Sequence, residues 1–185
     1  MKVINKVYRS FFVFLDRARS FVRLLHLQAK YPSLHIDWSS YIGRHVEIIC
    51  CDSGRGEIIQ TYIAKGTYIK IDEGATFAVR QSYIGADSMI VANLGIDIGP
   101  HCSIGEMVVI RDQNHRYGDD RLVKDSGYDT AKIELQENVW LGAKSTVLKG
   151  VVLGKNTVVG AHSLVNKSFP DNSVIGGTPA VLLRK

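Results

Sequence analysis

The sequence predicts an all-β chain wound into a parallel β-helix of about six coils, preceded by one amphipathic helix and interrupted by one loop. Aliphatic residues recur at every sixth position, glycine often follows them, and a single long polar segment breaks the pattern. A period of six matches neither a 3.6-residue helix nor an alternating strand. It is typical of a chain that turns through short flat faces, each with one aliphatic side chain pointing inward.

The repeat is unbroken in the C-terminal part and occurs in shorter runs before it. The unbroken run consists of Leu135, Leu141, Val147, Leu153, Val159 and Val165. The shorter runs consist of Ile42, Ile48, Ile63, Ile69, Ile84, Ile90, Ile98, Ile104 and Ile110. Three hexads would form one triangular coil of about 18 residues, and coils stacked about 4.8 Å apart would make each face a parallel sheet. Because the phase shifts between runs, we expect some turns to hold extra residues.

Glycine occupies the position after the aliphatic residue in many hexads, and alanine does so at Ala64. These glycines are Gly43, Gly85, Gly99, Gly105, Gly142, Gly154 and Gly160. Glycine at a corner indicates either a positive φ or a close approach of two backbones. An ordinary all-β domain rich in Ile-Gly pairs is the alternative, but its strands would not keep a six-residue register over several turns.

Residues 1–35 form a separate basic segment, which we predict to be a helix, and residues 36–185 form the β-helix. Seven of these 35 residues are basic and only Asp16 is acidic, so the segment has a net charge of 7 − 1 = +6. The rest of the chain has a net charge of −1, which gives the total of +5. Pro32 follows the pattern and can end the helix. Its apolar residues recur at intervals of three and four, which places them on one face: Val7, Phe11, Phe14, Ala18, Phe21 and Leu25.

Two interpretations of this helix stay open. The helix can pack on its own coil or on a neighbouring subunit, or it can lie as a basic amphipathic helix on an anionic membrane surface. No run of 18 apolar residues is present, so we expect no membrane span, and no signal-peptide pattern is found. Three cysteines without metal-ligand spacing indicate the cytoplasm as the default compartment. We expect no nucleic-acid partner, since no basic patch interleaved with aromatic residues occurs.

The interruption spans residues 111–134 and contains His115. Histidine titrates near neutral pH and is the most common general base in enzymes. Asp112, Asp119 and Asp120 lie in the same segment and could orient its imidazole ring. A lone histidine in a polar loop is otherwise most often a solvated side chain, so the neighbouring residues must decide between the two.

The neighbouring residues resemble those of the hexapeptide-repeat acetyltransferases. The resemblance lies in IGPHCSIGEMVVIRDQNHRYGDD and in ENVWLGAKSTVLKGVVLGKNTVVGAHSLVNKSFPDNSVIGGTPAVLLRK. It covers residues 84–185 through these motifs and residues 40–83 through the repeat alone. It implies a left-handed β-helix, although parallel strands otherwise favour right-handed crossovers.

The same resemblance implies a function. It points to an O-acetyltransferase that uses acetyl-CoA as co-substrate and no metal, in a homotrimer with active sites between subunits. His115 would be the general base in direct transfer to a sugar hydroxyl of a bacterial surface polysaccharide or its precursor. The alternatives are N-acetylation of a nucleotide-linked amino sugar and a non-catalytic trimeric scaffold.

Further site residues are also implied by the resemblance. Asp112 would orient His115 or contact the sugar, Asn93 would bind the acceptor, and Trp140 would form a wall of the cleft. A backbone N–H at Gly142 or Ala143 would meet the oxyanion. The remaining contacts to acetyl-CoA would come from Ala161, Asn166, Lys167, Arg184 and Lys185.

Overall fold

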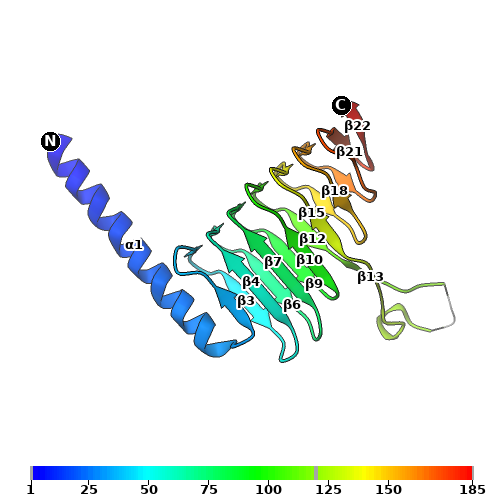
Figure 1. Cartoon of the computed structure of the whole chain (residues 1–185), viewed down its shortest axis with the longest axis horizontal. Helices are drawn as coiled ribbons and strands as arrows, with labels where there is room; N and C mark the ends of the chain where they lie inside the picture. Colours follow the sequence, from blue (N-terminus) through cyan, green and yellow to red (C-terminus); the bar gives the residue numbers. More distant parts are fainter. Residues whose placement is uncertain (1, 119–120, 185) are drawn as a thin grey trace.

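The helix α1 (Lys2–Lys30) lies at one end of a parallel β-solenoid, and one hairpin projects from its side (Figure 1). The structure is a computed structural model, which describes residues 2–118 and 121–184, with side chains from residue 12 onward. The expected β-helix of about six coils with an N-terminal helix is confirmed. No helix in the described part of the chain is long and apolar enough to cross a bilayer.

Three parallel sheets make up the solenoid, and each coil contributes a strand to faces A, B and C in turn. Face A consists of β1 (Leu34–Ile36), β4 (Arg55–Ile59), β7 (Thr76–Arg80), β10 (Gly95–Ile98), β15 (Ile133–Leu135) and β18 (Val152–Leu153). Face B consists of β2 (Tyr41–Ile42), β5 (Tyr62–Ile63), β8 (Tyr83–Ile84), β11 (Ser103–Ile104), β16 (Trp140–Leu141), β19 (Val158–Val159), β21 (Val174–Gly177) and the antiparallel β22 (Ala180–Arg184). Face C consists of β3 (Glu47–Cys50), β6 (Tyr68–Ile71), β9 (Met89–Ala92), β12 (Val109–Arg111), β17 (Thr146–Val147) and β20 (Leu164–Val165).

The aliphatic residues of the six-residue repeat form the core. Ile63, Leu141 and Val165 are fully buried, and none of the fifteen predicted positions is more than 3% exposed. Each stacks on the equivalent residue of the next coil, as Ile63 does on Ile84. The repeat therefore identifies the inward side chains correctly.

The first coils are longer than the last ones, which explains the phase shifts. Tyr41 pairs with Tyr62 and Thr146 with Leu164, so the coil lengths are 62 − 41 = 21 and 164 − 146 = 18 residues. The extra residues lengthen faces A and C, where strands reach four or five residues. Such strands bury two side chains instead of one, as β7 does with Phe77 and Val79.

The corner glycines are needed because adjacent coils approach closely there. A Cβ atom at Gly85 would lie 2.5 Å from the carbonyl carbon of Gly105. A Cβ at Gly142 would lie 2.5 Å from the amide nitrogen of Ala161. The positive φ falls two residues later instead, as at Lys144 with φ 59°. Close approach, and not a positive φ, therefore explains these glycines.

This packing predicts that Gly85→Ala destabilises the fold by about 1–3 kcal/mol, because the new methyl group meets backbone that cannot rotate away. Gly160→Ala is the matched control at the same corner, since its Cβ would have no neighbour closer than 3.5 Å. Denaturant unfolding of both variants measures the difference. Equal denaturation midpoints of the two variants would contradict the explanation. At the equivalent corner of one coil the chain has Ala64, so that coil accommodates a methyl group.

The C-terminal half of α1 covers the open edge of the first coil. Ser20 Oγ accepts a hydrogen bond from Ile42 N at 2.7 Å, and Arg23 Nε donates to Ile42 O at 2.9 Å. Gln28 accepts from Ile36 N at 3.0 Å and donates to Leu34 O at 2.8 Å. An uncovered strand edge exposes backbone groups that can pair with other chains. Helix side chains satisfy these groups here.

The predicted apolar face of α1 is not the face that packs on the solenoid. Phe14, Ala18, Phe21 and Leu25 are exposed, whereas the buried positions are Ser20, Leu24 and Leu27. The side chains of Val7 and Phe11 lie outside the described residues. The helix therefore packs on its own coil, as one of the two interpretations expected, but through another face, because hydrogen bonds to the open strand edge select that side of the helix.

Candidate functional site

The insertion leaves the solenoid at the corner between faces C and A. It follows β12 and returns to β15, and its core is an antiparallel pair of β13 (Gln113–His115) with β14 (Tyr128–Thr130). A short 3-10 helix η1 (Val123–Asp125) lies between them. Figure 1 shows this hairpin extending away from the stacked coils. The exposed residues of this hairpin, His115 among them, therefore face solvent and any neighbouring molecule.

Asp112 anchors the base of the insertion. Its side chain is fully buried, and its carboxylate accepts hydrogen bonds from Asn93 N at 2.8 Å, Leu94 N at 2.8 Å and Gly95 N at 2.6 Å. A buried carboxylate is tolerated only when it is bonded in this way. Both oxygens are thus engaged by the turn at residues 93–95, which anchors the insertion. Orientation of His115 or contact with the sugar by Asp112 stays a prediction.

Asn93 belongs to the same turn. Its side-chain Nδ2 donates to Asp72 Oδ2 at 3.2 Å, which fixes its amide on the neighbouring coil. Acceptor binding by Asn93 stays a prediction. Asp119, Asp120 and Lys185 lie outside the described residues.

His115 lies on β13 with its side chain exposed. Its ring is 4.6 Å from the ring of Tyr128 across the strand pair, with an interplanar angle of 47°. It borders an open hollow of about 600 Å³ whose lining consists of Asn114, His115, Arg116, Tyr117, Asp129 and Lys149. The imidazole therefore contacts the Tyr128 ring at the margin of a polar hollow and is open to solvent.

An ion pair ties this hairpin to the solenoid. Lys149 Nζ, from the corner after β17, lies 2.7 Å from Asp129 Oδ2 on β14. The hydrogen bond from Lys149 holds the pKa of the Asp129 carboxyl below its usual range. Gly150 N also donates to Ala131 O at 3.0 Å. Sequence reasoning missed Lys149 and Asp129, because neither lies on a repeat position and their proximity depends on how the chain returns.

The predicted site residues fall into two groups on opposite sides of the coil. The first group lies at the corner between faces C and A and consists of Asn93, Asp112, His115, Asn166 and Lys167. The second group lies on face B or at its corner with face C and consists of Trp140, Gly142, Ala143, Ala161 and Arg184. In a triangular coil the corner between C and A is opposite face B. One chain alone therefore does not bring Trp140, which is 54% exposed, to His115.

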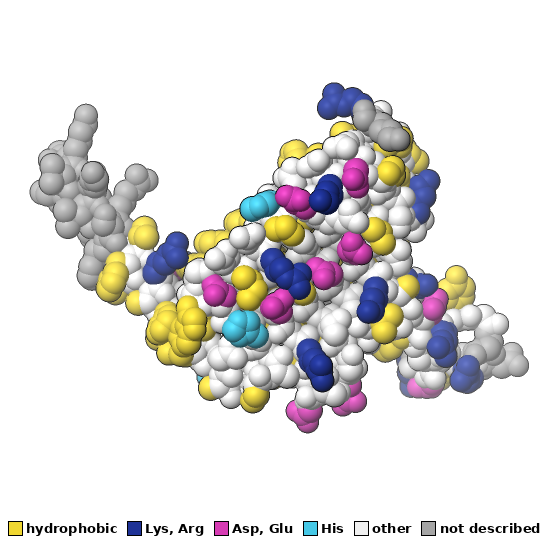
Figure 2. Space-filling view, viewed as in Figure 1, with side chains coloured by type: hydrophobic (Ala, Val, Ile, Leu, Met, Phe, Trp, Pro, Cys, Tyr) yellow, Lys and Arg dark blue, Asp and Glu magenta, His cyan; other side chains and the backbone are white. Residues whose placement is uncertain are grey.

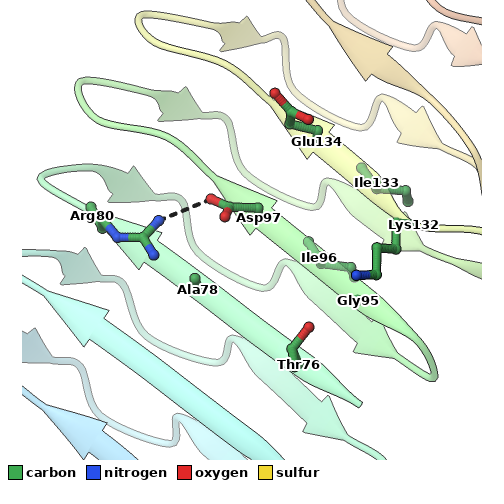
Figure 3. A pocket seen from close by; sticks show the side chains of 9 residues that line it. All are labelled: Thr76, Ala78, Arg80, Gly95, Ile96, Asp97, Lys132, Ile133 and Glu134. Atoms are coloured by element: carbon green, nitrogen blue, oxygen red, sulfur yellow. Dashed lines mark hydrogen bonds and ion pairs between the residues drawn. The ribbon is translucent and has the colours of Figure 1, made fainter.

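A second hollow, of about 370 Å³, lies on face A (Figure 3). Arg80 points across it to Asp97, with Nη1 3.0 Å from Oδ1, and its Nη2 lies 2.8 Å from Glu57 Oε2. Lys132 and Glu134 lie on the same surface. Because the Arg80 charge is already matched by two carboxylates and the lining contains no histidine, this groove is a weaker candidate for the chemistry.

Comparison with known proteins identifies the type of the six-residue repeat. Residues 132–167 match the model of the bacterial transferase hexapeptide (six repeats). Over these residues the chain is similar to the bacterial hexapeptide transferases. Over 103 residues it is 41% identical to galactoside O-acetyltransferase of Lactococcus lactis subsp. lactis, covering 56% of this chain and 49% of that protein. It is 36% identical to WbbJ of Escherichia coli K12, which is named for O-acetyl transfer in lipopolysaccharide biosynthesis, covering 49% and 50%.

The chain spans about half the length of these two relatives. Among solved structures it is similar to AntD, an N-acyltransferase from Bacillus cereus in complex with dTDP and 3-hydroxybutyryl-CoA. The TM-score is 0.66, the identity is 20%, and the match covers 89% of each chain. At this identity the likeness supports the fold alone.

The backbone hydrogen bonds distinguish the two candidate oxyanion donors. Gly142 N donates to Val159 O at 2.8 Å within the stack of coils. The Ala143 N–H has no acceptor among the residues that the structure describes, so it is the donor still available. Lys167 Nζ lies 5.6 Å from the centre of the Phe169 ring. Because Val147 pairs with Val165, Lys167 occupies the position equivalent to Lys149 in the next coil. No cluster of three metal-ligating side chains occurs within residues 2–118 and 121–184.

Proposed function

We propose that this chain transfers the acetyl group of acetyl-CoA to a sugar hydroxyl of a bacterial surface polysaccharide or its precursor. The observation that carries the proposal is the exposed His115 at the margin of the polar hollow, on the one insertion of a hexapeptide-repeat solenoid. The names of the galactoside and WbbJ relatives support the sugar hydroxyl as acceptor.

The chemistry needs one base and one oxyanion donor. A ring nitrogen of His115 accepts the proton of the acceptor hydroxyl while its oxygen attacks the thioester carbonyl carbon. The carbonyl oxygen gains negative charge, which the Ala143 N–H can stabilise. The carbon–sulfur bond then breaks, the sulfur leaves as the thiol of CoA with the proton from His115, and the ester remains. No covalent acyl-enzyme is required.

The separation of the two residue groups supports a site shared between copies of this chain. We infer a homotrimer in which His115 of one copy faces Trp140 and Ala143 of the next. CoA would extend along the C-terminal coils, where Ala161, Asn166, Lys167 and Arg184 are the candidate contacts. We infer a cytoplasmic reaction, because acetyl-CoA is supplied in that compartment.

Turnover tests the proposal directly. Release of the free CoA thiol is measured with nucleotide sugars, lipid-linked oligosaccharides and polysaccharides as acceptors. We expect release with at least one sugar class and a product that mild alkali hydrolyses, as it does an ester. An alkali-stable product would instead indicate N-acetylation of an amino sugar, the activity type that the AntD name suggests. No release with any acceptor would indicate a scaffold.

A further inference from the structure

The exposed side of α1 carries a continuous apolar stripe. We define the stripe by Phe14, Ala18, Phe21, Val22 and Leu25, which lie within one arc when residues advance by about 100° along a helix. Phe14 is 68% exposed and Val22 is 64% exposed. Figure 2 shows hydrophobic side chains gathered where the helix meets the first coils. An apolar surface of this kind, exposed in one chain, indicates a contact with something else.

Charged and aromatic residues border the stripe. At about 100° per residue, Arg17 and Arg19 lie on opposite flanks of it. Trp38, which is 63% exposed, extends the apolar surface, since its ring lies 5.6 Å from that of Phe21. The segment of residues 1–35 holds a net charge of 7 − 1 = +6, whereas the rest of the chain is close to neutral.

This combination favours lipid over a protein partner. Helices that lie in the plane of a membrane surface have an apolar stripe with aromatic residues and flanking Lys and Arg. The net charge of +6 on residues 1–35 also complements the negative charge of anionic lipid headgroups. The helix also diverges from the coils toward its N-terminus, so its apolar side is not shielded by the solenoid (Figure 1).

We propose that the stripe of α1 docks on an anionic membrane surface, with Trp38 at the level of the lipid headgroups. The Phe and Val side chains enter the boundary between headgroups and acyl chains, and the flanking arginines contact lipid phosphate. Docking would hold the solenoid beside the membrane. The inference does not depend on the proposed acetyl transfer, because none of these residues belongs to either group of site residues.

Co-sedimentation of the full chain with vesicles tests this proposal. We expect binding to vesicles of phosphatidylcholine with about 30% phosphatidylglycerol, and binding weakened by at least about tenfold in Phe14→Ser/Val22→Ser, since the bound helix buries both side chains in the lipid boundary. The matched control is Val181→Ser/Leu183→Ser, whose positions are 50% and 65% exposed at the opposite end of the chain. This control should bind as the unchanged protein does. Circular dichroism confirms that each variant is folded.

Three outcomes overturn the proposal. The unchanged protein fails to bind anionic vesicles, or both double variants bind equally well. In the third, Phe14→Ser/Val22→Ser lowers the oligomer mass in lipid-free analytical ultracentrifugation, which would make the stripe an interface between copies. Arg17→Gln/Arg19→Gln supplies an independent measure, because it should weaken binding to anionic vesicles and flatten the salt dependence.

Discussion

Replacing His115 by alanine should lower kcat by roughly 10²–10⁴-fold and leave acetyl-CoA binding nearly unchanged. The reason is that, in the proposed mechanism, the imidazole takes part only when the acceptor hydroxyl loses its proton. His115 lies on β13, away from the second group of residues on face B. Thiol release at saturating substrate measures kcat, and equilibrium dialysis with acetyl-CoA measures binding.

The insertion also supplies the control for this experiment. Leu122→Ala changes a side chain that is 64% exposed in the same insertion but outside the hollow, and its turnover should match that of the unchanged protein. Near-normal turnover in His115→Ala would remove the proposed base. Loss of acetyl-CoA binding in the same variant would assign His115 to substrate binding instead of proton transfer.

The sequence predicts the inward side chains of the solenoid well because one physical constraint repeats in every coil. Each hexad must bury one aliphatic residue, so Leu135 or Ile104 can be assigned without knowing what lies next to it. The corner glycines could be located but not explained, since their cause is the backbone of the next coil. That contact, as at Gly85, joins residues 20 positions apart, 105 − 85 = 20.

The helix shows where periodicity alone is insufficient. The spacing of Phe14, Phe21 and Leu25 correctly identifies an apolar stripe, yet the opposite side packs on the solenoid. Hydrogen bonds that Ser20 and Gln28 accept from backbone N–H groups of the open strand edges decide the orientation, and such bonds leave no periodic pattern in the sequence. The same holds for the Asp112 carboxylate, whose three partners are backbone N–H groups of a distant turn.

Mixing two inactive variants should restore activity if each site is shared between copies. His115→Ala removes the proposed base from the first group of site residues. Ala161→Trp obstructs the second group, because it places a large side chain at an exposed corner of face B. Each variant alone should turn over at least about 10²-fold more slowly than the unchanged protein. A trimer that contains both variants has one site that takes His115 from one copy and Ala161 from the other.

The expected recovery can be calculated from the assembly. With random co-assembly, about half of the sites receive an intact His115 and about half of those an intact second group, so roughly one quarter of normal activity returns. Co-expression of the two chains with different tags, followed by sequential purification, keeps only mixed trimers, in which roughly one site in three is intact. Thiol release that stays at the residual level in verified mixed trimers would mean that both groups act within one chain. That result would contradict the topology, because the corner between faces C and A and face B are on opposite sides of each coil.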